Sequence, residues 1–203
     1  MIRVNHPRDG LVTISLDRPD KANALTEPML DDLAQAFDAA GDARAVILTG
    51  TGRVFSAGAD LDAARAGLAL SPAWERLSGA IAAAPCLTIA ALNGTAAGGA
   101  MGMVLACDLR VAVPEARFFY PVMALGFLPQ PSDPPRLAAL VGPSRARMIL
   151  MAGQRIDAAE ALSWGLVDRL AGAEVLMDTA EALAAAALGA APGHVAAIKA
   201  RMG

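Results

Sequence analysis

The stretch NGTAAGGAMGMVLACD, residues 93–108, places four glycines in a ten-residue window and then runs into an apolar segment that ends in an acid. Gly98 and Gly99 precede a predicted helix, so the unbonded N–H groups of its first turn would face whatever binds there. Glycine leaves such amides unobstructed, and they suit a carbonyl oxygen that gains negative charge. A second small-residue loop, GTGRVFSAGADL at 50–61, follows a predicted strand and closes on Asp60. Amides from these two loops are expected to form an oxyanion hole.

Working outward from this stretch, short apolar strands alternate with amphipathic helices, which predicts the α/β class. The chain opens with a predicted hairpin that turns at Asp9-Gly10. The last third is mainly helical, with one short strand within 165–170. The predicted strands are 2–6, 11–16, 43–50, 85–92, 108–113 and 116–120, and the helices before the last third are 27–41, 71–84 with Ser71 as its cap, and 98–107.

Composition narrows the functional classes. The chain has 203 residues, 55% of them hydrophobic, and a net charge of −3 with scattered basic residues, so we expect one domain and neither nucleic-acid nor membrane binding. Cys86 and Cys107 lie in apolar runs, which is typical of reduced thiols and predicts a cytoplasmic protein. The polar N-terminus and the interrupted apolar runs predict neither export nor a membrane span.

Three common site chemistries find no support in the motifs. No glycine-rich fingerprint joins a first strand to a helix with an acid at the right distance, which argues against a dinucleotide site. The two histidines, His6 and His194, lie near the ends and belong to no nucleophile signature. His, Cys and acidic residues do not have metal-ligand spacing, so no metal is expected.

Four motifs resemble those of the enoyl-CoA hydratase/isomerase family, the crotonases, in the family's order. They are LDRPDKANAL (16–25), RVFSAGADL (53–61), LTIAALNGTAAGGAMGMVLACDLRVA (87–112) and LVGPSRARMILMAGQRIDAAEALSWGLVDRL (140–170). The resemblance implies a crotonase-like spiral of β-β-α units over residues 1–170 and a C-terminal helical layer. Residues 171–203 would form a segment shorter than in most relatives. It also implies a lyase or isomerase of fatty acid metabolism that works as a homotrimer or hexamer.

The same resemblance assigns site residues. The substrate would be an acyl-CoA, with CoA as part of the substrate and no separate cofactor. Its thioester carbonyl would lie between the backbone amides of Ala59 and Gly99. The residues expected to line the substrate are Lys21, Ala22, Ala24, Ala57, Gly58, Asp60, Leu61 and Gly98. Simpler interpretations stay open: Lys21 as a solvated charge, Asp60 and Asp108 as acids bonded to nearby backbone, and Gly98 with Gly102 as a close helix contact.

The sequence departs from the family where the acids of water addition belong. Gly102 and Val122 stand at the positions of the two family glutamates, and neither residue transfers a proton. Gln130 stands where some relatives have an aspartate, within LPQPSDPPRL (128–137), which replaces a glycine-rich stretch.

Two nearby residues are candidate replacements for the missing acids. Asp133 is a candidate acid or base if burial raises its pKa, and Tyr120 is a second candidate. The alternatives are a helix N-cap at Ser132 or Asp133 and a packed aromatic at Tyr120. Two functions therefore remain: an enzyme that stabilises a thioester enolate, or a non-catalytic acyl-CoA binding protein.

Overall fold

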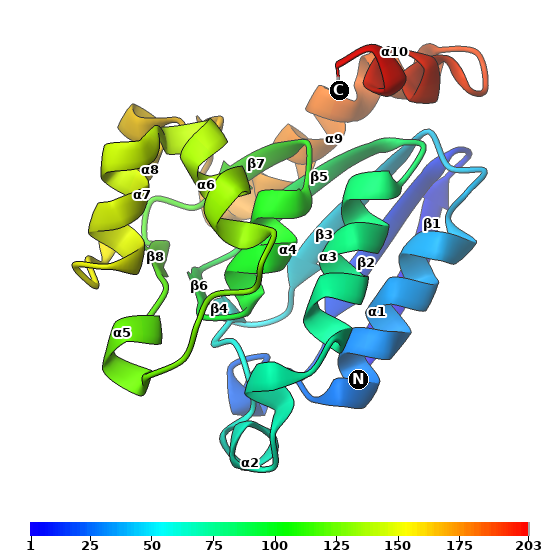
Figure 1. The fold of residues 1–203 in the computed structure, drawn as a ribbon. Coiled ribbons are helices and arrows are strands. Elements are labelled where there is room, and N and C mark those ends of the chain that lie inside the picture. The colour runs from blue at the N-terminus through cyan, green and yellow to red at the C-terminus, as the bar shows by residue number, and fades with distance from the viewer. Residues whose placement is uncertain (203) are drawn as a thin grey trace.

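Two sheets form the framework of the computed structural model, which describes residues 1–202 (Figure 1). The larger sheet has the order β1-β2-β3-β5-β7-β10 and is parallel apart from the β1–β2 hairpin. The smaller sheet has the order β4-β6-β8-β9 and is parallel apart from β8–β9. The strands are β1 (Ile2–Arg8), β2 (Leu11–Leu16), β3 (Ala45–Gly50), β4 (Val54–Ser56), β5 (Leu87–Leu92), β6 (Thr95–Ala97), β7 (Leu109–Ala112), β8 (Arg117–Phe119), β9 (Ile156–Asp157) and β10 (Arg169–Leu170).

Helices cover both faces of the larger sheet. Figure 1 shows α1, α3 and α4 in front of it and α9, which contacts β3, β5 and β7, behind it. The helices are α1 (Glu27–Ala39), α2 (Leu61–Arg65), α3 (Ala73–Ala83), α4 (Ala100–Ala106), α5 (Val122–Leu125), α6 (Asp133–Val141), α7 (Pro143–Leu150), α8 (Ala158–Trp164), α9 (Leu176–Gly189) and α10 (His194–Met202), with short 3-10 turns η1 (Pro19–Lys21), η2 (Leu68–Leu70) and η3 (Ala173–Val175). Strands covered on both faces are nearly continuous apolar runs, as β3 and β5 are.

The predicted spiral of β-β-α units is confirmed. Three successive units, β3–β4–α3, β5–β6–α4 and β7–β8–α5, each place their first strand in the larger sheet and their second in the smaller sheet. The sequence does not predict β4 and β6, because three residues in small-residue loops give no periodic signal. These two strands lead directly into the loops at 57–60 and 98–99.

The C-terminal helices form the predicted helical layer, although Gly203 lies outside the described residues. Lys199 on α10 donates from Nζ to the carbonyls of Ala84 and Cys86, at 3.0 and 3.1 Å, and to Asp108 Oδ2 at 2.9 Å. Asp108 also accepts from the backbone N and the hydroxyl of Thr88. Asp108 therefore has a structural role, in line with the simpler interpretation of this residue. Its partners, Thr88 and Lys199, are distant in the sequence and not the nearby backbone that was expected.

No single helix within residues 1–202 is both long and apolar enough to cross a membrane. Ala173–Gly189 and His194–Met202 pass that test of length and composition only as a pair, bent by 103°.

Candidate functional site

The loops at 57–60 and 98–99 lie against each other because β4 and β6 pair in parallel and end side by side. Gly58, with φ +89°, permits the contact. A Cβ added there would lie 2.6 Å from the carbonyl oxygen of Ala97 and 3.4 Å from the nitrogen of Gly99. Only glycine fits both this spacing and this left-handed backbone. The chain thus brings the backbone of two β-strand ends together at one place.

Two amides in these loops are unpaired. The N–H groups of Gly58, Asp60 and Gly98 each donate a hydrogen bond within the chain, at 2.8 to 3.2 Å. The N–H groups of Ala59 and Gly99 donate none to any residue from 1 to 202. Both residues border the same pocket. Each loop therefore has one free backbone donor, in a residue that borders the pocket.

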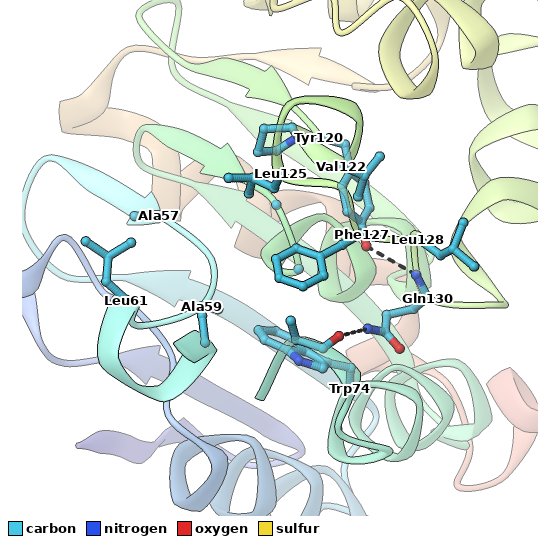
Figure 2. Close-up of a pocket in the computed structure, with 15 residues that line it drawn as sticks. Ala57, Ala59, Leu61, Trp74, Tyr120, Val122, Leu125, Phe127, Leu128 and Gln130 are labelled. Carbon is cyan, nitrogen blue, oxygen red and sulfur yellow. Dashed lines mark hydrogen bonds between the residues drawn. The ribbon is translucent and has the colours of Figure 1, made fainter. Parts of the chain in front are cut away.

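The pocket has a volume of about 180 Å³ and a mostly apolar lining. Figure 2 shows Ala59 and Leu61 on one side of it, and Phe127 and Gln130 on the other. Trp74, from α3, lies against the Gly99 loop, where a Cβ on Gly99 would come within 2.8 Å of the indole ring. An apolar group beside two amide donors suits a carbonyl compound with a hydrocarbon chain.

Tyr120 and Asp133 form a buried pair at the wall of this pocket. The Tyr120 hydroxyl donates to Asp133 Oδ2 at 2.8 Å. It also accepts a hydrogen bond from the backbone N–H of Gln130 at 3.4 Å (Figure 2). Asp133 is 1% exposed, and its Oδ1 has no hydrogen-bond partner among the described residues. Tyr120 borders the pocket, whereas Asp133 lies behind it.

The surroundings of Asp133 favour its protonated form. Burial raises the pKa of this carboxyl to about 6, and the charge of Glu75 adds to the rise. The hydrogen bond from Tyr120 and the charge of Arg136 lower the pKa, but by less. Burial and the neighbouring carboxylate also raise the pKa of Tyr120, so its hydroxyl stays protonated. Asp133 therefore titrates at about pH 6, closer to neutral pH than an ordinary aspartate, which suits proton transfer.

The alternative of a helix start with Ser132 as N-cap and proline in the first turn is confirmed in position, whereas Asp133 is the first residue of α6 and not its N-cap. Ser132 occupies the N-cap position, but its side chain accepts no cap hydrogen bond, and its N and Oγ donate to Glu75 Oε1 at 3.0 and 2.9 Å. The next two helical positions after Asp133 are Pro134 and Pro135, which have no N–H for a cap to bind. The Asp133 side chain is instead turned to Tyr120.

Gly102 and Val122, which the motif resemblance places at the family's glutamate positions, lie close to this pair. Val122 begins α5 and borders the pocket. Gly102, on α4, faces Asp133: a Cβ on Gly102 would lie 3.1 Å from Oδ1 and 3.2 Å from Oδ2. The carboxylate of α6 thus fills the space that a side chain on α4 would enter.

The other predicted substrate residues fall into two groups. Ala57, Leu61 and Gly98 border the pocket with the two free amides. The segment with Lys21, Ala22 and Ala24 lies outside the pocket but beside its wall, since the Ala22 carbonyl accepts from the Ala57 amide at 3.0 Å, and Lys21 is exposed.

The Asp60 side chain stabilises the local structure. Its carboxylate accepts from the amides of Asp62 and Ala63 and so caps α2, and it pairs with Arg18 at 2.7 Å. The hydrogen bond from Arg18 is the main cause that lowers the pKa of this carboxyl.

Several lining residues carried no functional signal in the sequence. Trp74 is one of the periodic apolar positions of α3, and Leu125, Phe127 and Leu128 are exposed apolar residues around α5. A helical apolar position predicts burial, but the sequence does not show which buried face borders a ligand pocket.

Comparison with known proteins gives the same family as the motifs. The Enoyl-CoA hydratase/isomerase family profile matches residues 7–203. The chain is 37% identical to the probable enoyl-CoA hydratase echA6 of Mycobacterium tuberculosis, over 80% of this chain and 68% of that protein. It is 38% identical to the carnitinyl-CoA dehydratase of Citrobacter koseri, over 93% of this chain and 75% of that protein.

Solved structures agree with the sequence relatives. The crystal structure of the enoyl-CoA hydratase from Bacillus anthracis superposes with a TM-score of 0.92 at 32% identity, over 99% of this chain and 81% of that one. The structure of Pseudomonas aeruginosa DspI has a TM-score of 0.91 at 31% identity, over 99% and 85%. The fold, the motifs and the relatives agree, and the chain belongs to the enoyl-CoA hydratase/isomerase family.

Proposed function

We propose that this protein binds an acyl-CoA thioester and polarises its carbonyl oxygen between the backbone N–H groups of Ala59 and Gly99. One observation carries the proposal: these two amides have no acceptor within residues 1–202, while the amides of Gly58, Asp60 and Gly98 are all used. Ala59 and Gly99 are half-buried at one apolar pocket, so their two unpaired donors suit an acceptor from a ligand.

The polarised carbonyl supports enolate chemistry. When a C–H bond next to the carbonyl breaks, negative charge moves to the oxygen, and fixed donors in an apolar pocket stabilise that charge. Loss of one such donor typically lowers the rate by about a hundredfold to a thousandfold. Addition of water is not the proposed reaction, since Gly102 and Val122 offer no group to direct a water molecule. The proposed activity is that of a lyase or isomerase acting through a thioester enolate.

The residues that line the pocket suggest where the acyl chain and the CoA portion of the substrate would lie. The acyl chain would lie among Leu61, Trp74 and Phe127, and the CoA portion along the Lys21–Ala24 segment and the loop that begins at Ala57. CoA is part of the substrate, and no separate cofactor is proposed. The homotrimer or hexamer and the cytoplasmic location stay predictions.

The test compares two ligands that differ only at the carbonyl. Butyryl-CoA has the thioester oxygen, and S-butyl-CoA, a thioether, does not. Two hydrogen bonds of about 1 kcal/mol each predict that the wild type binds butyryl-CoA at least roughly tenfold more tightly, as measured by calorimetry. Equal affinity for the two ligands contradicts the proposal.

Gly99 offers a matched pair of variants. Its φ of −58° suits proline, so Gly99→Pro removes the donor with the local backbone angle kept. Gly99→Ala adds the same Cβ beside the Trp74 ring but keeps the N–H. Gly99→Ala should preserve the preference for butyryl-CoA, and Gly99→Pro should reduce it severalfold. An equal preference for butyryl-CoA over S-butyl-CoA in both variants would show that the thioester carbonyl does not bind the Gly99 N–H.

A further inference from the structure

The geometry points to Tyr120 and Asp133 as a proton relay, in which the Tyr120 hydroxyl exchanges a proton with the substrate carbon and with Asp133 at the same time. This inference rests on the proposed function, because the relay acts on a thioester polarised by the two amides. It also divides the roles: Tyr120 is the group that touches the substrate, and Asp133 is a positioning residue and proton acceptor behind it.

Tyr120 is the proton-carrying group at the pocket. Of the described residues that line it, Tyr120 alone has an ionisable side chain. Its oxygen is held from two sides, by the bond to Asp133 at 2.8 Å and by the Gln130 amide at 3.4 Å. The Gln130 side chain in turn donates to the carbonyl of Ala69 at 3.3 Å, which anchors the segment. The hydroxyl is therefore fixed in direction before a ligand arrives, which lowers the cost of reaching a reactive geometry.

Asp133 is arranged to accept a proton and not to bind a cation. The carboxyl is 1% exposed, forms no salt bridge with the described residues and leaves Oδ1 without a partner. A buried carboxylate with no salt bridge and one oxygen without a partner is costly, so a site that keeps one has a reason beyond stability.

The groups that face Asp133 leave its proton affinity high. They are Glu75 on α3, which opposes the charged form, and Arg136 on α6 and the Tyr120 hydroxyl, which favour it. Gly102, the neighbour on α4, adds no charge. Burial exceeds the two favourable contacts and raises the pKa to about 6. A carboxylate with this pKa takes up a proton more readily than an ordinary aspartate, and it is still mostly ionised at neutral pH.

The step balances without another reactant. The C–H bond next to the thioester carbonyl breaks, its electron pair moves to the carbonyl oxygen, and the proton bonds to the Tyr120 oxygen. The hydroxyl proton of Tyr120 moves to Asp133 Oδ2. The products are an enolate, a neutral tyrosine and a neutral Asp133, so no free tyrosinate forms. Reversal at a different carbon shifts a double bond and consumes no water. This places a 3-enoyl thioester among the substrates.

The test uses 3-butenoyl-CoA in D₂O. The wild type should incorporate deuterium and form crotonyl-CoA, both followed by mass spectrometry. Tyr120→Phe and Asp133→Asn should each lower the exchange rate by about a hundredfold or more, with butyryl-CoA affinity within about threefold of the wild type. Asp157→Asn, an aspartate on β9 that does not border the pocket, is the matched control and should exchange at the wild-type rate.

The pH profile separates proton transfer from a structural role. The wild-type rate should rise as pH increases through about 6, where Asp133 loses its proton, and Asp133→Asn should lack this rise. A wild type that binds butyryl-CoA without exchange, or exchange at the wild-type rate in either variant, overturns the relay and leaves the carbonyl site standing. A wild type with no preference for butyryl-CoA over S-butyl-CoA overturns the proposed function, and the relay with it.

Discussion

The carboxylate of Asp133 occupies the space into which a side chain at Gly102 would project. A Cβ on Gly102 would lie 3.1 Å from one carboxylate oxygen and 3.2 Å from the other. The two residues come from different helices, α4 and α6, and both are buried. The Asp133 carboxylate on α6 can occupy this space because Gly102 on α4 has no side chain.

This contact predicts opposite effects of Gly102→Ala in two backgrounds. In the wild type the new methyl group crowds the buried carboxylate, so the variant should be less stable. In an Asp133→Ala background the crowding is gone, and replacement of a helical glycine by alanine should stabilise the protein by about 0.5–1 kcal/mol. Urea denaturation of the four proteins measures both effects. The same effect of Gly102→Ala in both backgrounds would contradict the contact.

The pKa of Asp133 predicts a pH-dependent stability difference. Because the pKa is raised from 3.8 to about 6 in the folded protein, the folded state holds a proton that the unfolded state has lost between these values. The contribution of Asp133 to stability is thus fully present below about pH 4 and is lost as pH rises through about 6. Asparagine resembles the protonated acid at every pH.

Asp133→Asn should therefore be more stable than the wild type at pH 8, by about 1–3 kcal/mol, and the difference should shrink toward pH 4. Urea denaturation across this range measures the difference between the two proteins, which removes the contribution of other carboxyl groups. A difference that stays constant from pH 4 to pH 8 would contradict the raised pKa. If Asp133→Asn is more stable than the wild type but loses proton exchange with the substrate, Asp133 lowers stability and contributes to catalysis.

Much of the fold was predictable because it depends on local patterns. Apolar runs such as β3 and β5, and the periodic positions of α1 and α3, fix the element types. The glycines of the loop at 98–99 likewise predicted free amides, which is right for Gly99, whereas the Gly98 N–H donates to the carbonyl of Phe119. The short strands β4 and β6 were not predictable, because a three-residue strand is defined by its neighbours in the sheet.

The candidate site was predictable only in part. Ala59, Gly99, Tyr120 and Asp133 were named as candidates from motifs and residue type, but how they lie relative to one another depends on tertiary packing. That Tyr120 faces the pocket and Asp133 lies behind it follows from how α6 packs on α4, which no local pattern encodes. The start of α6 was predictable, because Ser132 and two prolines are typical of a first helical turn, but the turn of the Asp133 side chain toward Tyr120 was not.

The Asp60 carboxylate predicts an effect on the carbonyl site without contact with the ligand. It caps α2 and pairs with Arg18 at 2.7 Å, and it directly follows Ala59. Asp60→Ala should loosen the Ala59 amide and reduce the preference for butyryl-CoA over S-butyl-CoA severalfold. Asp60→Asn keeps an oxygen for the helix cap and should reduce it less. Calorimetry with both ligands checks this. An unchanged preference in Asp60→Ala would show that the amide is held by other contacts.

A glutamate at Gly102, where the motif resemblance places a family glutamate, is the sharpest test of the Gly102–Asp133 arrangement. The wild type should hydrate crotonyl-CoA near the background rate, because no acid at Gly102 or Val122 directs a water molecule. Gly102→Glu alone should not help. It brings a second carboxylate against Asp133 in a buried place, so the variant should lose stability through crowding and like charge.

The combination of Gly102→Glu with Asp133→Ala vacates that space, and addition of Val122→Glu supplies the second acid. Each proton-transfer group typically contributes about a hundredfold or more, so hydration by the triple variant should exceed that of its Gly102→Gln counterpart by at least roughly tenfold even with imperfect geometry. The loss of ultraviolet absorbance of the conjugated thioester measures the rate. Hydration by the wild type at the rate of the triple variant would show that the protein already has a water-directing group. If Gly102→Glu were tolerated equally well with and without Asp133, the two carboxylates would not compete for one site.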